Sequence, residues 1–448
     1  MSESTLMIIH DTVAKTNHSS ESAVMNKLSF EDRSVHDWYR FVLSFPPHLV
    51  REYIRRFELT ENSCVLDPFC GTGTTLVECK KNGIPSIGVE AHPMMCFASQ
   101  VKVNWNPNPD GLMKHARVIA KRVMTDLEKV GIDDIPCFQS NVALSEDRLK
   151  SLNSEQMKLL LHDSISPLPL HKSLILIDTL NECHEECYYG HETLAMAKAI
   201  VNNISNLHFG PEVGVGMKKD DAPVISPWLS NICDMTRDIR DLARNINTSS
   251  VVHHADSRQI MTLIEEKSVD AVITSPPYPN EKDYTRTTRL ESVLLGFIHD
   301  KTELRKYKQS LMRSNTRNVY KGDEDDVWVA NFPEIQRIAD EIEAKRIALE
   351  KTSGFERLYA KVTKLYFGGM TRHLAELRRI LRPGAKLAYV VGDQASYLQV
   401  MIHTGNLLAD IGASLGYEVV GIDLFRTRQA TATRKKLREE VVLLRWPG

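Results

Sequence analysis

The chain has 448 residues, 42% of them hydrophobic and 25% charged, a balance typical of globular proteins and not of disordered or membrane chains. Lys and Arg total 56 against 58 for Asp and Glu, so attraction to a polyanion would depend on local basic patches. Eight cysteines do not indicate a dense disulfide framework, and no export signal or membrane span is recognisable, so we expect a cytoplasmic, nucleoid-associated protein.

The first part of the chain predicts a strand–helix–strand unit after a loosely ordered arm at residues 1–34. Periodic and continuous apolar residues place a helix at 47–57, then a strand that ends at Asp67. A helix at 74–81, a strand at 86–90 and a helix at 93–103 follow. This order is typical of a parallel sheet with helices packed against it.

Residues 106–248 interrupt the rhythm and read as mainly helical, with a strand at 173–177 and a long helix at 226–246. An insertion of that length predicts a separate domain. Strands and helices then alternate again. Strands are expected at 251–254, 269–273, 386–391, 418–424 and 440–444, and helices at 285–298, 333–349, 355–381 and 407–415. The predicted fold is α/β, with a mostly parallel, Rossmann-like sheet covered on both faces.

The first motif is Asp67–Thr75, with the sequence Asp-Pro-Phe-Cys-Gly-Thr-Gly-Thr-Thr, between a strand and a helix. Two glycines allow the backbone to pass close to a ligand, and a helix N-terminus offers unpaired N–H groups. The motif lacks the Lys of a phosphate-binding P-loop and the GxGxxG pattern of dinucleotide enzymes. Glu90, at the end of the next strand, is placed to accept both hydroxyls of a ribose.

The second motif is Ser275-Pro276-Pro277-Tyr278, directly after the strand at 269–273. Consecutive prolines fix the backbone and remove two N–H donors, so carbonyl oxygens are held as rigid acceptors. Ser275 Oγ and the Pro276 carbonyl could accept the two hydrogens of an exocyclic amino group, and Tyr278 offers a flat face for a base. A surface turn without function is the alternative interpretation.

Together, Asp67–Thr75 and Ser275–Tyr278 resemble the S-adenosylmethionine motif and the catalytic motif of amino-group DNA methyltransferases, in particular the cytosine-N4-specific type. The resemblance implies a seven-stranded sheet, S-adenosylmethionine as cofactor and double-stranded DNA as substrate, with a cognate restriction endonuclease as a candidate partner. It covers residues 35–105 and 249–448 as the catalytic domain. Because the last expected strand lies near the end of the chain, target recognition is expected within 106–248, or secondly within 300–332.

The resemblance also assigns roles to single residues. The catalytic group is Ser275, Pro276, Pro277 and Tyr278. The cofactor-binding group is Phe45, Pro46, Asp67, Pro68, Phe69, Gly71, Gly73, Thr74, Thr75, Glu90, Asp256 and Ser257. Asp256 and Ser257 correspond to the position beside the adenine ring, and Phe45-Pro46 to the element that closes over the methionine end.

The target base stays open at this point. Adenine-specific relatives more often carry Asp or Asn before Pro-Pro-Tyr, so Ser275 favours cytosine N4 over adenine N6. An RNA amino-methyltransferase and a non-catalytic cofactor-binding module are further alternatives. A carbon-5 cytosine enzyme would need a nucleophilic Cys after Pro, and Pro136-Cys137 lies in the insertion instead of at the expected site.

Local charge favours a nucleic acid partner. Residues 301–321 contain seven Lys or Arg and one acidic residue, and residues 426–438 contain six Lys or Arg and none. Such stretches could neutralise phosphates, although solvated faces would look alike. Cys183, Cys187 and His191 have the spacing of one helix face, but structural zinc usually takes four ligands, so we predict no metal site.

Overall fold

The computed structural model describes residues 28–41, 43–134, 148–209, 212–280, 282–429 and 436–448. Its central sheet has seven strands in the order β5-β2-β1-β6-β7-β9-β8. The strands are β1 (Val65–Asp67), β2 (Ser86–Glu90), β5 (Ser250–His254), β6 (Val269–Thr274), β7 (Leu381–Gly392), β8 (Glu418–Gln429) and β9 (Lys436–Arg445). Neighbouring strands from β5 to β7 are parallel, and β9 runs antiparallel to both β7 and β8.

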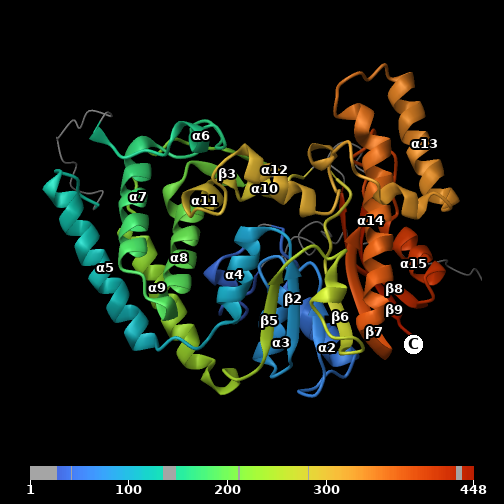
Figure 1. The fold of residues 1–448 in the computed structure, drawn as a ribbon, viewed down its shortest axis with the longest axis horizontal. Helices are drawn as coiled ribbons and strands as arrows, with labels where there is room; N and C mark the ends of the chain where they lie inside the picture. The colour runs from blue at the N-terminus through green and yellow to red at the C-terminus, as the bar shows by residue number, and fades with distance from the viewer. Residues whose placement is uncertain (1–27, 42, 135–147, 210–211, 281, 430–435) are drawn as a thin grey trace, which may run out of the picture.

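Alternating side chains of the strands build two separate cores, one on each face of the sheet. Val65, Ala271 and Ala388 pack on one face with helix α2 (Pro47–Arg56), which lies beside α3 (Thr74–Lys81). Leu66 and Val272 pack on the other face with α13, α14 and α15. Those helices span Pro333–Ala348, Tyr359–Ile380 and Thr404–Ser414, and Figure 1 shows them beside the edge formed by β7, β9 and β8. This three-layer arrangement confirms the predicted fold class.

The inserted segment is helical and packs onto the sheet domain at the opposite end of the molecule (Figure 1). It consists of α5 (Pro109–Lys129), α6 (Ser154–Met157), α7 (Pro167–Glu182), α8 (Glu186–Ala199), α9 (Ile225–Asp241) and the hairpin β3–β4 (Leu207–Phe209 and Val213–Val215). Its apolar side chains form one continuous core with those of α3 and of α4 (Pro93–Val103). Cooperative unfolding with the catalytic region is therefore expected.

Two predicted elements differ from the structure. Residues 173–177, expected as a strand, lie inside the buried helix α7, which starts with Pro167. A short apolar run is compatible with both a buried strand and a buried helix. Only the length of the element and the residues on either side distinguish the two. The single helix expected at 285–298 is divided into α10 (Tyr284–Thr287) and α11 (Arg289–Leu294) at Thr288, whose hydroxyl bonds to His92.

The N-terminal arm predicted at 1–34 lies mostly outside the described residues, and Pro136-Cys137 lies outside them as well. Within the described part of the chain, no helix has both the length and the apolar character needed to cross a membrane.

Candidate active site

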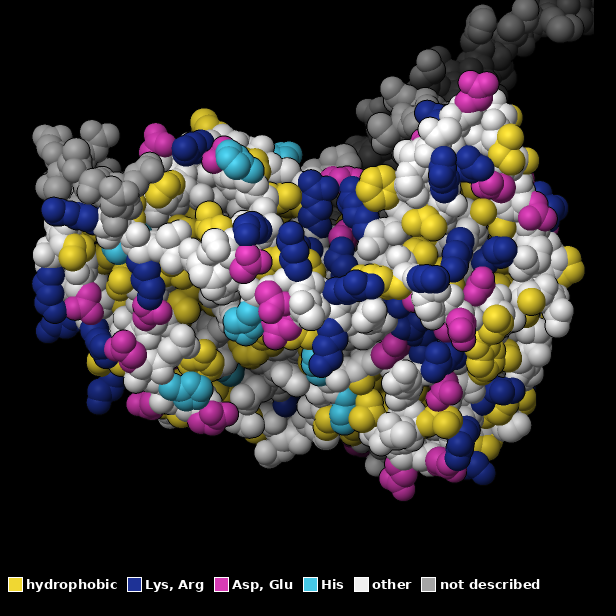
Figure 2. Space-filling view, turned by 45° about the horizontal axis from the view of Figure 1, so that its top comes forward, with side chains coloured by type: hydrophobic (Ala, Val, Ile, Leu, Met, Phe, Trp, Pro, Cys, Tyr) yellow, Lys and Arg dark blue, Asp and Glu magenta, His cyan; other side chains and the backbone are white. Residues whose placement is uncertain are grey.

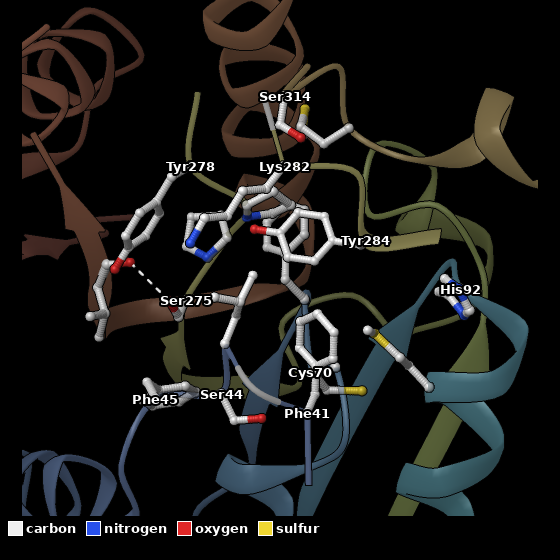
Figure 3. A pocket seen from close by; sticks show the side chains of 18 of the residues that line it. Phe41, Ser44, Phe45, Cys70, His92, Ser275, Tyr278, Lys282, Tyr284 and Ser314 are labelled. Atoms are coloured by element: carbon white, nitrogen blue, oxygen red, sulfur yellow. Dashed lines mark hydrogen bonds between the residues drawn. The ribbon is translucent and has the colours of Figure 1, made fainter. Parts of the chain in front are cut away.

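The two motifs lie at one cavity of about 580 Å³, a size within the range of roughly 300–1,000 Å³ that is usual for ligand pockets. The cavity opens at the carboxyl ends of β1, β2, β5, β6 and β7, the edge at which open α/β sheets bind ligands. Its wall includes the glycine turn of the first motif and all four residues from Ser275 to Tyr278. Figure 3 shows Phe45, Ser44 and Cys70 on one side of this cavity, with Ser275 and Tyr278 facing them.

Asp67 joins the two motifs directly. Its Oδ1 accepts hydrogen bonds from the Thr274 hydroxyl at 2.6 Å and from the Phe69 N–H at 3.1 Å. The residue is fully buried, and its Oδ2 has no hydrogen-bond partner among the described residues. Burial raises the pKa of Asp67 to about 6, although these hydrogen bonds oppose the shift. The aspartate therefore holds the loop after β6 against the loop after β1 and does not itself line the cavity.

The glycine turn is shaped by backbone conformation and by a close neighbour. Gly71 and Gly73 have φ of 52° and 84°, in the left-handed region that favours glycine. A Cβ on Gly73 would lie 2.6 Å from Ser99 Oγ on α4, so only glycine fits there without displacement. The turn therefore delivers the N-terminus of α3 to the cavity wall.

Glu90 ties the same turn to the end of β2. Its carboxylate oxygens accept hydrogen bonds from the N–H groups of Gly71 and His92, both at 2.8 Å. Burial raises the pKa of Glu90 to about 7, against the effect of these backbone donors. Each oxygen keeps a lone pair for a ligand hydroxyl, so a diol such as a ribose can be bound at this edge of the cavity.

After β5, the carboxylate predicted to lie beside a ligand is already hydrogen-bonded to an arginine. Asp256 and Ser257 line the cavity as predicted, but Asp256 is also engaged by Arg258, whose guanidinium donates to both of its carboxylate oxygens. Arg258 also pairs with Asp325, which begins the short helix η7 (Asp325–Val329). Asp256 is thus held in place by a buried arginine, and a ligand would meet an oriented carboxylate.

The second motif presents a serine, two prolines and a packed tyrosine. The Ser275 hydroxyl donates to the Val390 carbonyl of β7 at 3.2 Å, which leaves its oxygen lone pairs as acceptors (Figure 3). Tyr278 lies against the end of β7, where a Cβ on Gly392 would be 3.0 Å from its ring. Burial raises the pKa of Tyr278, and the nearby Glu439 carboxylate adds to this effect. Tyr278 is therefore a neutral, flat wall of the cavity.

Comparison with known proteins gives a consistent result. Residues 11–100 match the family model of N6/N4-type DNA methylases. The chain is related to the amino-group DNA methyltransferases. This relationship confirms the resemblance inferred from Asp67–Thr75 and Ser275–Tyr278, and it does not distinguish cytosine N4 from adenine N6.

Two methyltransferases resemble this chain over most of its length, and two further proteins resemble part of it. Type II methyltransferase M.BsoBI of Geobacillus stearothermophilus is 25% identical over 90% of this chain and 83% of its own. M.AvaI of Nostoc is 23% identical over 92% and 86%. M.MjaII of Methanocaldococcus jannaschii is 37% identical over 17% and 14%. A crystal structure of TTHA0409, a candidate DNA modification methylase from Thermus thermophilus, superposes with a TM-score of 0.21 at 16% identity, over 43% of this chain and 51% of that one.

Most of the residues predicted for the methyltransferase site line the cavity. These are Phe45, Pro46, Pro68, Phe69, Gly71, Thr74, Glu90, Asp256, Ser257 and the four residues of the second motif. Asp67, Gly73 and Thr75 lie behind the wall and support it, Thr75 through a 3.1 Å hydrogen bond to the Ile273 carbonyl. In the structure these three residues support the wall of the cavity, and their role in cofactor binding stays a prediction.

Sequence reasoning missed several polar residues of the same cavity, among them His92, Lys282, Arg428 and Glu439. His92 is buried, its Nε2 bonds to Thr288 at 2.9 Å, and burial lowers its pKa to about 4. Lys282 follows the second motif by four residues, so proximity in the sequence was an available signal. Arg428 and Glu439 come from β8 and β9, and only the folded sheet brings them to Ser275.

The cavity fits an S-adenosyl ligand in its donor set. Apolar Phe45 and Phe69 stand beside two strand-end carboxylates, Glu90 and Asp256, and the turn is free of side chains at Gly71 and Gly73. A nucleoside needs an acceptor for its ribose hydroxyls and a surface for its base. The residues present therefore meet the requirements of the cofactor that the methyltransferase relationship implies.

The basic stretches are only partly available for a polyanion. Lys308 pairs with Asp283 at 2.6 Å, Arg313 pairs with Asp323 at 2.8 Å, and Arg426 donates to Glu439 at 2.6 Å. Figure 2 nevertheless shows Lys and Arg side chains gathered between the end of the molecule that carries the inserted helices and the end that carries α13. A DNA duplex bound across the region between these two ends would contact positive charge near the cavity.

The spacing of Cys183, Cys187 and His191 does not correspond to one helix face. Cys183 caps the end of α7, Cys187 is exposed on α8, and the buried His191 bonds to the Asn104 carbonyl at 2.9 Å. Within the described ranges, no group of three or more His, Cys, Asp or Glu side chains is arranged to hold a metal ion.

Proposed function

We propose that this protein is a DNA methyltransferase that transfers the methyl group of S-adenosylmethionine to the exocyclic N4 amino group of cytosine in double-stranded DNA. We place it in a restriction–modification or epigenetic marking role. The observation that supports this best is the single cavity lined by both motifs, with the Asp67–Thr274 hydrogen bond joining their loops. The Type II methyltransferases that align over most of the chain support the DNA substrate.

Cofactor binding is assigned to the residues around the glycine turn. Glu90 would accept the ribose hydroxyls, Asp256 and Ser257 would border the adenine, and Phe45 would cover the methionine end. When bound, S-adenosylmethionine supplies an electrophilic methyl group on a sulfonium. The protein supplies the position of that group relative to Ser275.

The second motif would bind the target amino group. The amino nitrogen of cytosine is a poor nucleophile because its lone pair is delocalised into the ring. Ser275 Oγ, whose own proton is directed to the Val390 carbonyl, and the Pro276 carbonyl can accept the two N–H groups and favour a pyramidal nitrogen. Most of the acceleration would then come from positioning and electrostatics, without a covalent enzyme adduct.

The target base must leave the duplex to reach Ser275, at a cost of a few kcal/mol that stacking on Tyr278 would partly offset. We place sequence recognition in the insertion 106–248, with 300–332 as the second region. Replacing segments of 106–248 with those of a relative should change the methylated site, and an unchanged site preference would move recognition elsewhere.

The experiment that tests the function is transfer of tritium-labelled methyl groups to plasmid DNA and to total RNA, followed by digestion to nucleosides. N4-methylcytosine from DNA is the expected product. N6-methyladenine from DNA would show that the enzyme is adenine-specific. Label in RNA alone would refute DNA as the substrate. Cofactor binding without methyl transfer to DNA or RNA would indicate a non-catalytic binding module.

A further inference from the structure

The cavity contains a half-buried lysine that the proposed chemistry does not use. Lys282 lines the wall a few residues after the second motif, and among the described residues its ammonium has neither a hydrogen bond nor an ion pair. Figure 3 shows its side chain between Tyr278 and Tyr284, above Ser275. A cation in partial burial without an acceptor is costly unless a ligand supplies one.

The backbone on both sides fixes the place from which this lysine projects. The Lys282 N–H donates to Asn280 Oδ1 at 3.0 Å, and its carbonyl accepts from Asn315 Nδ2 at 3.1 Å. Both asparagines are buried. These two hydrogen bonds hold the backbone of Lys282 at the cavity wall.

A second cation lines the same cavity and comes from β8, the edge strand of the sheet. Arg428 on β8 lines the cavity, and its guanidinium donates to the Asp393 carbonyl at 3.2 Å. Its Nε lies 3.3 Å from Glu439 Oε1, but Glu439 already accepts a 2.6 Å hydrogen bond from Arg426. One carboxylate thus serves two arginines, and among the described residues it makes no ion pair with Lys282.

The electrostatics of Lys282 agree with this arrangement. Burial lowers its pKa first, the Arg428 cation lowers it further, and the Glu439 and Glu212 carboxylates act in the opposite direction. Glu212 is more than half exposed and lies 3.9 Å from Arg286. Two like charges that repel each other across a cavity would both be stabilised by an anion placed between them.

We propose that Lys282 and Arg428 bind a backbone phosphodiester of the extruded target nucleotide. This inference rests on the proposed function, because it takes the base to lie at Tyr278 and Ser275. The amino end of that base has its acceptors in Ser275 and Pro276, and the base itself is neutral. The anion within reach of the same nucleotide is its own phosphate, and a lysine–arginine pair suits a phosphate oxygen.

The test compares Lys282→Gln and Arg428→Gln with the wild type on duplexes whose phosphates next to the mapped target are either charged or replaced by neutral methylphosphonates. On charged DNA we expect each variant to lose roughly tenfold in DNA affinity and in kcat/KM. The slope of log DNA affinity against log salt concentration should decrease in magnitude by about 1 in each variant, as expected for the loss of one phosphate contact. At one of the substituted phosphates the neutral linkage should weaken DNA binding by the wild type clearly more than it weakens DNA binding by Lys282→Gln, in which only Arg428 remains to contact the phosphate.

Lys267→Gln is the matched control. Lys267 is exposed and precedes β6 at the end of the strand opposite to the cavity, so its replacement should change none of these values. Thermal melting of each variant shows whether the fold is retained. The inference is wrong if Lys282→Gln equals the control, if its loss is the same on charged and neutral linkages at every position, or if it weakens S-adenosylmethionine binding in the absence of DNA.

Weaker S-adenosylmethionine binding by Lys282→Gln in the absence of DNA would mean that the lysine binds the carboxylate of the cofactor. Failure of the proposed function has a different signature. DNA affinity that depends on Lys282 without methyl transfer would retain the phosphate site and refute the enzyme, whereas normal transfer independent of Lys282 would refute the phosphate site alone.

Discussion

Replacing Asp67 with Asn tests the bridge between the two motifs through stability. Burial raises the pKa of Asp67 from 3.8 to about 6, so the folded protein binds a proton more tightly than the unfolded chain does. Ionisation of this group therefore destabilises the fold, and the destabilisation grows as the pH rises from about 4 through about 6. From the difference in pKa, ionisation of Asp67 lowers the free energy of unfolding by about 3 kcal/mol at pH 8 and by about half of that at pH 5.

Asp67→Asn removes the ionisation while nearly preserving the shape of the side chain. Relative to wild type, the free energy of unfolding of the variant should rise by about 1.5 kcal/mol between pH 5 and pH 8. The new amide N–H₂ needs a partner at the position of the unpaired Oδ2, so the absolute gain at pH 8 should stay below about 3 kcal/mol. Cofactor affinity should fall in the same variant, because Asp67 positions the glycine turn.

The assay is guanidinium denaturation of the cofactor-free protein at several pH values, with Asp410→Asn on the exposed face of α15 as the matched control. A stability difference between Asp67→Asn and wild type that is independent of pH, or that becomes less favourable as the pH rises, would refute the argument that the buried carboxylate is ionised at a cost.

Three further predictions concern the reaction. Ser275→Ala should lower the rate of methyl transfer by roughly 10²–10³-fold in single-turnover measurements, with cofactor affinity unchanged, because an acceptor for the amino group is lost. Gly392→Ala should lower kcat and leave cofactor binding intact, since its Cβ would lie 3.0 Å from the Tyr278 ring; an unchanged kcat would show that the ring position does not matter. Cofactor affinity measured by calorimetry should rise with pH through about 7, as Glu90 ionises and becomes a better acceptor. Glu90→Gln should abolish that dependence, and a pH profile retained in the variant would assign it to another group.

Local patterns were sufficient to predict much of the sheet domain. Helix 74–81 and helix 93–103 have the predicted bounds, since a glycine turn and a proline mark their starts. The strand predicted at 173–177 was wrong because this short apolar run lies in helix α7, whose buried face also carries polar His171 and Lys172, so no helical period of apolar residues is visible. The alternation of strands and helices along the chain was enough to predict the fold class. The apolar character of a short segment was not enough to decide between a buried strand and a buried helix.

The candidate site was predicted less completely, because its contacts join distant parts of the chain. Nothing in the sequence around Asp67 indicates a hydrogen bond to Thr274, and the pairing of Arg258 with Asp325 depends on how η7 packs. Lys282 and Arg428 line the same cavity only because β8 joins the sheet beside β9. Residue types therefore indicated the chemistry, and the fold determined which side chains line the cavity and which support its wall.

The central claim is that the loops after β1 and β6 form one site in which a methyl donor meets an amino group. The most direct measurement is a crystal structure of the protein with S-adenosylhomocysteine and a short duplex that contains the mapped target. We predict the ribose at Glu90, the sulfur facing Ser275, and an extruded cytosine stacked on Tyr278. Cofactor density away from the glycine turn, or a target base bound outside the cavity that Ser275 lines, would contradict the account.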